Sequence, residues 1–191
     1  MEPGFIRDIE ECLKILHSGG LILYPTDTIW GIGCDATNET AVEKIYQLKK
    51  RSDKKTMIIL LTDERDILTY VTQPDLRVFD YIKDIRKPTT VIYEGATGLA
   101  ENLINIEGSI AIRIVKEPFC KTLIKRFREP IVSTSANISG YPSPLVFGDI
   151  DIAIKKGVDY VVEYRQDDLT PAIPSAIIKW NKDGSYNIIR S

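Results

Sequence analysis

Apolar runs of strand length alternate with amphipathic segments through the early part of this chain, and this alternation limits the folds that the chain can adopt. The strand-like runs lie at residues 21–24, 57–61, 89–93 and 109–114. Apolar residues at helical spacing fill residues 6–16, and Gly19-Gly20 is a typical end for such a helix. Strands that alternate with helices predict an α/β fold, in which helices cover a sheet.

Three further helices are predicted from their start signals and their apolar spacing. A capping-box pattern from Thr40 to Glu43 begins the first of them, with Asn38 as an alternative cap. Pro74 and Pro118 stand where the other two can begin, because proline is favoured in the first helical turn. The residues expected to face the core are Ala41, Ile45 and Leu48, then Leu76, Phe79 and Ile82, then Phe119, Leu123 and Phe127.

More strands are expected in the last third of the chain. Residues 131–137 read as a strand that runs into a polar turn, and residues 158–164 and 174–180 read as late strands. Asp183-Gly184 then predicts a tight turn into residues 185–190, which makes a closing hairpin. Together these patterns predict a twisted mixed sheet flanked by helices, in one domain over residues 1–191.

The composition is that of a globular chain with no global affinity for nucleic acid. Of 191 residues, 43% are hydrophobic and 27% are charged, which is enough to build an ordinary core. The net charge of −2 excludes a strong overall positive field, so any RNA contact would need a local basic patch. The acidic, periodic N-terminus is not a signal peptide, and no apolar stretch reaches membrane-spanning length, so the cytoplasm is the expected compartment.

Cysteine and histidine usage disfavours several kinds of site. Three widely spaced cysteines without a CxxC pair predict neither a disulfide framework nor a structural zinc site. The single histidine, His17, lies near the end of the first predicted helix, where a surface or packing role is expected. A Ser-His-Asp triad, a Cys-His pair or a His-ligated metal is therefore disfavoured, and any catalysis would rest on cations, hydroxyls and positioning.

Residues 24–35, YPTDTIWGIGCD, present hydroxyls, an indole and two glycines directly after a buried strand. Taken alone, PTDT is best explained as a proline-containing turn. Residues 31–36 fit the GxGxxA pattern, but the strand ends several residues too early for a dinucleotide-binding fold, and no acidic residue follows at the required spacing. The sequence also shows no P-loop, so nucleotide binding would need another architecture.

Basic residues gather between the second predicted helix and the following strand. The cluster consists of Lys49, Arg51, Lys54 and Lys55. Such cations either complement a helix C-terminus and solvate a loop, or bind an anion, most naturally a polyphosphate.

Arg113 and Arg190 each end an otherwise apolar strand, where a charge needs a counter-ion or a bound anion. Residues 133–140, STSANISG, are either an ordinary polar loop or a site for several ligand oxygens.

Together, these stretches resemble the YrdC-type threonylcarbamoyl-AMP synthases. The resemblance is carried by YPTDTIWGIGCD, by KKR with Lys55 four residues later, and by IRKPTTVI, IAIRI, STSANISGYPSP and PSAII…IIR, in the family's order over nearly the whole chain. It implies a twisted α/β sheet with a large concave basic surface. It also implies that L-threonine, bicarbonate or CO2, and ATP with Mg²⁺ give threonylcarbamoyl-AMP and pyrophosphate, for threonylcarbamoyladenosine modification of tRNA next to the anticodon.

The resemblance also implies roles for residues that match the family by position. The implied threonine pocket consists of Thr28, Arg113, Ser133 and Ser175, with Arg113 on the carboxylate. The implied ATP side consists of Arg51, Lys55, Ser109, Ser135, Asn137, Ser143 and Arg190, and the implied catalytic cations are Lys49 and Arg51. Trp30 would form a wall of the pocket. A downstream threonylcarbamoyl transferase is the implied protein partner, with tRNA as a further candidate and no membrane partner.

A second function stays open on the sequence alone. A concave basic face could bind tRNA or double-stranded RNA without catalysis, because phosphate-binding cations serve both purposes. The pairing of hydroxyls with arginines favours the enzyme, since a phosphate-backbone site needs mainly positive charge. Release of pyrophosphate that depends on threonine and bicarbonate would separate the two hypotheses.

Overall fold

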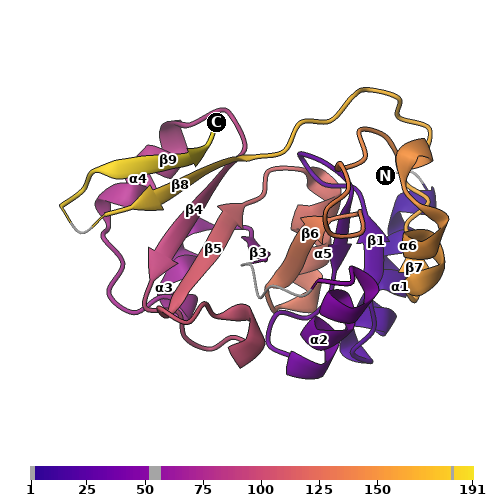
Figure 1. The fold of residues 1–191 in the computed structure, drawn as a ribbon, viewed down its shortest axis with the longest axis horizontal. Helices are drawn as coiled ribbons and strands as arrows, with labels where there is room; N and C mark the ends of the chain where they lie inside the picture. The colour runs from indigo at the N-terminus through magenta and orange to yellow at the C-terminus, as the bar shows by residue number, and fades with distance from the viewer. Residues whose placement is uncertain (1–2, 52–56, 182) are drawn as a thin grey trace.

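A mixed sheet organises the protein, as the sequence predicts. The structure, a computed structural model, describes residues 3–51, 57–181 and 183–191. Its nine strands follow the order β7-β1-β2-β6-β3-β5-β4-β8-β9 (Figure 1). They are β1 (Ile22–Tyr24), β2 (Gly31–Gly33), β3 (Ile58–Leu61), β4 (Thr89–Glu94), β5 (Ser109–Ile114), β6 (Ile131–Ser135), β7 (Tyr160–Val161), β8 (Ala176–Trp180) and β9 (Tyr186–Arg190). Parallel pairs join β1 to β7, β3 to β5 and β4 to β8, and the other pairs are antiparallel.

Helices flank this sheet at both of its ends. They are α1 (Pro3–His17), α2 (Glu39–Leu48), α3 (Ile67–Tyr70), α4 (Arg77–Asp84), α5 (Pro118–Phe127) and α6 (Ile152–Gly157), with short 3-10 turns η1 (Glu64–Asp66), η2 (Glu101–Leu103) and η3 (Phe147–Asp149). Figure 1 shows α1, α2, α5 and α6 around the end that carries β1 and β7, and α3 and α4 beside β4, β8 and β9. The ring of Phe5 in α1 meets Phe119 in α5 edge to face, with centroids 5.4 Å apart.

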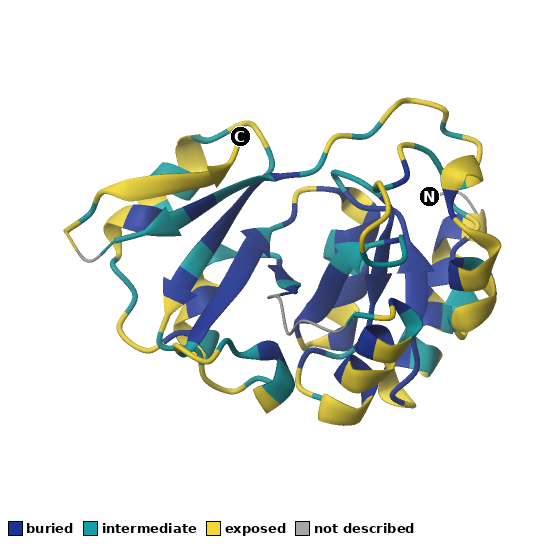
Figure 2. Ribbon diagram, in the orientation of Figure 1, coloured by how far each residue is buried: buried dark blue, intermediate teal, exposed yellow. Residues whose placement is uncertain are grey.

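Burial follows the amphipathic pattern of the elements. Figure 2 shows the central strands buried, the helices exposed on their outer sides, and β9 exposed along its length. Helix α5 buries Phe119, Leu123 and Phe127, which the apolar spacing predicts. Burying such side chains removes apolar surface from water, which is the main favourable term in folding.

Two local predictions need correction. The cap of α2 is Asn38, the alternative cap, because its side chain accepts a hydrogen bond from the backbone N–H of Ala41; the helix already begins at Glu39, one residue before Thr40. Leu76 was expected to face the core, but it is 62% exposed, since α4 begins only at Arg77. Val78 takes the buried position instead. In both cases the helix begins a residue or more away from the start that its motif predicts, whereas the predicted core residues Ala41 and Ile45 of α2 are buried as expected.

The segment between β7 and β8 matters for the site. These two strands lie far apart in the sheet order, so residues 162–175 must pass along the sheet. Figure 1 shows this segment above the sheet, between the end that carries β7 and strand β8. The last residues of this crossing, Pro174 and Ser175, line the cavity described below. Within the described residues, no helix has both the length and the apolar character needed to cross a membrane.

Candidate active site

Strand register places side chains from β2 across to β9 on one face of the sheet. Side chains alternate between the two faces along a strand, and residues directly opposite each other share a face. The opposed pairs on this face are Gly31 with Ser135, Ser133 with Ile58, Ile58 with Ala111, Ala111 with Ile92, and Ile177 with Arg190. Arg113 lies two residues beyond Ala111 on β5 and therefore faces the same way.

A cavity of about 260 Å³ opens on this face. It is lined by many of the residues predicted from the sequence: Thr28, Arg51, Arg113, Ser133, Ser135, Ser143, Ser175 and Arg190. Ile58, Ile92, Ala111 and Ile177 give it an apolar lining. An apolar cleft with a few convergent polar groups is the usual form of a small-molecule site.

The cavity concentrates positive charge. Arg51, Arg113 and Arg190 all line it, although they come from distant parts of the sequence. The pKa of the Arg190 guanidinium is lowered from its ordinary value, mainly by burial and to a smaller extent by the positive charge of Arg113. Positive charges that lie close together and partly buried repel one another, which raises the free energy of the protein without a ligand. An anion bound between them would therefore be strongly favoured.

Arg113 is held by acidic and hydroxyl groups of the PTDT turn. Its side chain is only 3% exposed, and its Nη2 atom lies 3.0 Å from Oδ1 of Asp27 and 3.5 Å from Oγ1 of Thr26. The Nε atom of Arg113 is buried without a hydrogen-bond partner among the described residues. The guanidinium is therefore oriented by protein groups while part of its donor capacity stays unused.

Asp27 and Thr26 are functional candidates that no sequence pattern predicted. Thr26 is buried, its Oγ1 donates to the carbonyl of Ile29 at 2.8 Å, and it lies 3.0 Å from Oγ1 of Thr28. Asp27 stands next to Thr28 in the same turn and pairs with Arg113. Their adjacency to Thr28 was the available signal, but only the fold shows that the turn reaches β5.

A second hydroxyl network positions Ser175. Oγ of Ser175 lies 2.8 Å from Oγ1 of Thr90, which is fully buried on β4. Arg190 donates from Nε to the carbonyl oxygen of Ser175 at 3.0 Å and from Nη2 to its hydroxyl at 3.4 Å. Thr90 was also missed from the sequence, because a threonine in a β-branched strand gives no sign of a polar role.

Lys49 is buried and does not line the cavity. Its Nζ donates to the backbone carbonyl of Ser135, to that of Asn137 at 2.6 Å, and to Oδ1 of Asn137 at 3.3 Å. The pKa of Lys49 is lowered from 10.5 to about 7, mainly because the side chain is buried and to a smaller extent because of the positive charge of Arg51. With its donors used in this way, Lys49 holds the loop after β6 in place, whereas the resemblance implied a catalytic cation.

The remaining predicted ATP-side residues separate into three groups. Asn137 lines a neighbouring cavity of about 860 Å³, and Ser143 lines both cavities, which joins them. The structure does not bring Ser109 to either one: it is fully buried at the start of β5 and bonds to Asn105 and Glu107. Lys55 lies outside the described residues, and so does Lys54 of the basic cluster.

The aromatic and glycine residues of YPTDTIWGIGCD are used in different ways. Trp30 packs on Phe147 at 4.8 Å between ring centroids and does not line the first cavity, which differs from the wall expected for it. A Cβ on Gly31 would approach Oγ of Ser133 to 3.0 Å, inside the cavity lining. Gly33 instead serves packing, since a Cβ there would lie 2.6 Å from the ring of Tyr24. Only the first glycine therefore brings backbone to the site.

Carboxylate, histidine and cysteine side chains are the usual metal ligands of a protein. Among the described residues, no group of three or more His, Cys, Asp or Glu side chains could hold a metal ion. Mg²⁺ commonly keeps its waters and binds through one or two carboxylates together with substrate phosphates. The described residues therefore present no cluster of three such side chains for a metal ion.

Comparison with known proteins gives consistent results. Residues 14–191 match the Sua5/YciO/YrdC family model, whose description is "Telomere recombination". The threonylcarbamoyl-AMP synthase of Coxiella burnetii is 34% identical over 142 residues, which cover 72% of this chain and 75% of that relative. P. abyssi Sua5, solved with L-threonine, superposes on 95% of this chain with a TM-score of 0.83 and 20% sequence identity. This chain spans about half of that protein, 53% of its length. E. coli YciO gives 0.82 at 22% identity, over 97% of this chain and 89% of its own.

Proposed function

The chain belongs to the Sua5/YciO/YrdC family, and from this premise we propose that it is a threonylcarbamoyl-AMP synthase. It joins L-threonine, bicarbonate or CO2, and ATP into threonylcarbamoyl-AMP and releases pyrophosphate. A separate transferase then carries the threonylcarbamoyl group to an adenosine of tRNA. We place this activity in one domain in the cytoplasm, and the three buried, free cysteines fit a reducing compartment.

The observation that carries the proposal is the convergence of three arginines and several hydroxyls in one cavity. Arg51, Arg113 and Arg190 face the same space as Ser133, Ser135 and Ser175. A carboxylate and a polyphosphate are the anions that such a combination would bind, because arginine grips their oxygens bidentately and hydroxyls add contacts without charge. A phosphate-backbone site for RNA would not need a partly enclosed, serine-lined cleft.

L-Threonine is assigned to the Arg113 end of the cavity. Its carboxylate would bind the unused donor edge of Arg113, and Thr28, Ser133 and Ser175 would orient its amine and hydroxyl. Asp27, which pairs with Arg113, would then lie beside the substrate and favour the orientation in which the amine points toward a carboxylate. The amine must lose a proton before it can take up CO2 as a carbamate, and the Asp27 carboxylate would be the general base that accepts this proton.

ATP is assigned to the Arg51 and Ser143 side, from which it extends into the second cavity past Asn137. A carbamate oxygen attacks the α-phosphorus, the bond to the β-phosphate oxygen breaks, and pyrophosphate leaves with the electron pair. Negative charge grows on phosphate oxygens in this step, and Arg51 would stabilise it electrostatically. Mg²⁺ would enter bound to the triphosphate and supply further charge neutralisation.

Pyrophosphate release tests the proposal. Purified protein with L-threonine, bicarbonate and MgATP should release pyrophosphate, and omission of threonine or bicarbonate should reduce the rate to background. Arg65→Ala is a matched control for arginine variants, because Arg65 is exposed and pairs locally with Asp63. Pyrophosphate release that does not depend on threonine, or binding of tRNA without any release, would contradict the assignment and favour the RNA-binding function.

A further inference from the structure

Residues 162–175, which cross the sheet, contact the PTDT turn through Arg165. The Nη1 atom of Arg165 donates to the backbone carbonyl of Thr26 at 3.1 Å. A cavity of only about 10 Å³ remains between the two segments, and Thr26 and Thr28 line it together with Arg165 and Asp168. Such a space holds one water at most. The crossing segment therefore packs directly on the turn that carries Thr28.

The guanidinium of Arg165 is held in turn by Asp168. Its Nη2 and Nε atoms donate to Oδ2 of Asp168 at 2.9 and 3.2 Å. The other carboxylate oxygen, Oδ1, accepts the backbone N–H of Thr170 at 3.0 Å. Hydrogen bonds from Thr170, and then the one from Arg165, lower the pKa of Asp168 to about 2. Asp168 is therefore charged at neutral pH and fixes the direction of the guanidinium.

The backbone of Arg165 is strained. Its φ angle is 65°, and it is the third residue of a turn that the N–H of Gln166 closes on the carbonyl of Glu163 at 3.3 Å. A positive φ at this position favours glycine, because it strains a residue that has a side chain. Lys50 and Arg128 also have positive φ, but they lie just after α2 and α5, where this conformation is usual. Strain of this kind at Arg165 indicates that its side chain has a role.

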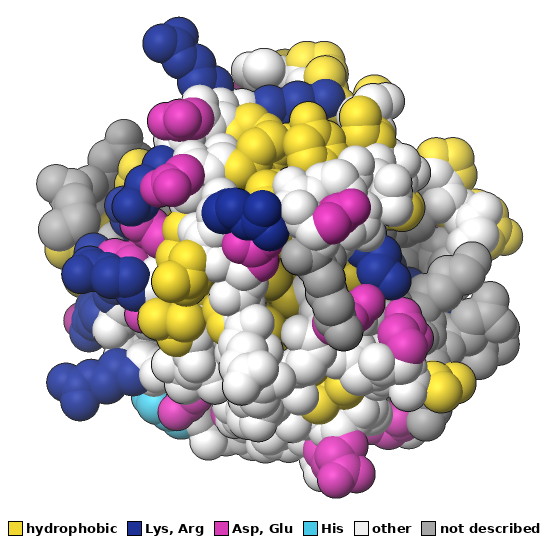
Figure 3. All heavy atoms as spheres, turned by 90° about the vertical axis from the view of Figure 1, so that its left-hand side faces the viewer, with side chains coloured by type: hydrophobic (Ala, Val, Ile, Leu, Met, Phe, Trp, Pro, Cys, Tyr) yellow, Lys and Arg dark blue, Asp and Glu magenta, His cyan; other side chains and the backbone are white. Residues whose placement is uncertain are grey.

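An exposed arginine–carboxylate pair alone would indicate little. Figure 3 shows Lys and Arg side chains beside Asp and Glu side chains on the end of the molecule that carries α4, β8 and β9, and such pairs contribute little to stability. Arg165 differs because its third contact is Thr26. Oγ1 of Thr26 accepts the backbone N–H of Thr28 at 3.0 Å and lies 3.5 Å from Nη2 of Arg113. A shift of Thr26 would therefore move the groups assigned to L-threonine.

We propose that Arg165 is a positioning residue of the threonine pocket. It holds the carbonyl of Thr26 from outside the cavity and thereby fixes the direction in which Asp27 and Thr28 meet the amino acid. The inference rests on the proposed function, which assigns this pocket to L-threonine. In the hydrogen bonds described, Arg165 donates to Thr26 and Asp168 and to no residue assigned to ATP, so its loss should affect threonine binding more than the phosphate chemistry.

Arg165→Gly tests this role, because glycine removes the guanidinium and also relieves the left-handed backbone. Its melting temperature should stay within about 4 °C of that of the natural protein. Isothermal titration calorimetry should show a Kd for L-threonine that is raised about tenfold, as expected when a hydrogen bond from a charged group is lost. The KM for threonine in pyrophosphate release should rise to a similar extent, while kcat at saturating threonine changes much less.

Asp168→Asn separates the pair from the turn of the backbone. The amide oxygen of asparagine can still accept the N–H of Thr170, whereas the charge that orients Arg165 is lost. This variant should raise the Kd for L-threonine in the same direction as Arg165→Gly, but by less, because Arg165 can still reach the carbonyl of Thr26.

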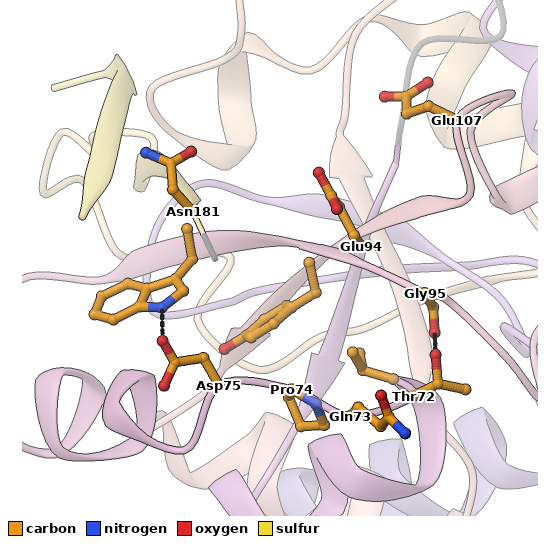
Figure 4. A pocket seen from close by; sticks show the side chains of 11 residues that line it. Thr72, Gln73, Pro74, Asp75, Glu94, Gly95, Glu107 and Asn181 are labelled. Atoms are coloured by element: carbon orange, nitrogen blue, oxygen red, sulfur yellow. Dashed lines mark hydrogen bonds between the residues drawn. The ribbon is translucent and has the colours of Figure 1, made fainter. Parts of the chain in front are cut away.

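Arg77→Ala is the matched control. Arg77 also pairs with an aspartate, Asp75, at 2.7 Å, and donates to a backbone carbonyl, that of Asp183, at 3.2 Å. Asp75 lines a different cavity, shown in Figure 4, where it accepts a hydrogen bond from Nε1 of Trp180. Loss of Arg77 should therefore leave the affinity for L-threonine unchanged.

Hydrogen–deuterium exchange reports on the turn itself, whatever reaction the protein catalyses. Residues 26–29 should exchange faster in Arg165→Gly than in the natural protein or in Arg77→Ala. The positioning role is overturned if these residues exchange equally fast in all three proteins, or if the natural protein and Arg165→Gly bind L-threonine equally tightly. A natural protein that neither binds L-threonine nor releases pyrophosphate would instead refute the proposed function, and the exchange rates would still decide whether Arg165 holds the turn.

Discussion

Arg113 joins the PTDT turn to β5 through its pair with Asp27, and this contact fixes the guanidinium in the cavity. Arg113→Ala should raise the KM for L-threonine about tenfold to a hundredfold, because a hydrogen-bonded charge contact contributes about 1.5–3 kcal/mol. Steady-state pyrophosphate release as a function of threonine concentration measures the change. Circular dichroism should first show that the variant folds, and an unchanged KM in a folded variant would remove Arg113 from the threonine pocket.

Arg51 differs from Arg113 because its charge is assigned to the reacting phosphates. Arg51→Ala should lose about 2–4 kcal/mol of transition-state stabilisation, by analogy with the loss of one preorganised charge contact. The ratio kcat/KM for ATP, determined beside that of Arg65→Ala, gives this value directly. Turnover by Arg51→Ala that matches the Arg65→Ala control would refute the role.

Lys49 provides a prediction about pH. The unfolded chain keeps Lys49 protonated to about pH 10.5, whereas in the folded protein its pKa is about 7. Between these values the unfolded state binds more protons, so this group makes folding more favourable as the pH rises, by up to about 1.4 kcal/mol per pH unit. Urea unfolding at several pH values above neutrality gives the free energy of unfolding of the natural protein and of Lys49→Met. This free energy should rise with pH through this group only in the natural protein, and the same pH dependence in both proteins would contradict the prediction.

The residue types of the site were predictable from sequence, but several of their orientations were not. Arg51, Arg113 and Arg190 were expected and do converge with most of the predicted hydroxyls, whereas Ser109 does not reach the cavity. Lys49 was expected to face the ligand, but its long stem turns toward the carbonyls of the loop after β6. The direction of a flexible side chain depends on tertiary partners that no local pattern shows. Asp27 and Thr90 were missed for the same reason.

At the scale of elements, patterns with strong local signals were predicted best. Strand β5 and helix α5 lie where their apolar residues and Pro118 place them. Strand β2 was missed because Gly31-Ile32-Gly33 has low strand propensity. It forms because pairing with β1 and β6 fixes it, with Ile32 opposite Leu23 and Thr134. The late strand expected over residues 158–164 is only Tyr160–Val161.

The close packing of β2 gives a stability prediction. A Cβ at Gly33 would lie 2.6 Å from the Tyr24 ring and 2.8 Å from the carbonyl oxygen of Val132. Gly33→Ala should therefore destabilise the protein by about 1–3 kcal/mol, the usual cost of overpacking. Gly148→Ala is the control, since a Cβ there meets no atom within 4 Å. Equal midpoints of urea unfolding for the two variants would show that β2 is less tightly packed than described.

At the scale of the whole molecule, the site depends on the complete sheet. The cavity lining runs from Gly31 of β2 to Arg190 of β9, and residues 162–175 cross the sheet to deliver Ser175. Ligands that bind only this assembled face should stabilise the whole fold. L-Threonine with a non-hydrolysable ATP analogue should raise the melting temperature of the natural protein more than that of Arg113→Ala.

Mass spectrometry of the reaction product tests the central claim most directly. The purified protein, incubated with L-threonine, bicarbonate and MgATP, should form a species with the mass of threonylcarbamoyl-AMP. The same species should carry the added mass when ¹³C-bicarbonate is supplied. Arg51→Ala should form far less of it than Arg65→Ala. Absence of this product from folded, natural protein under these conditions, or equal amounts from the two variants, would contradict a cavity that brings an amino acid and a nucleotide triphosphate together.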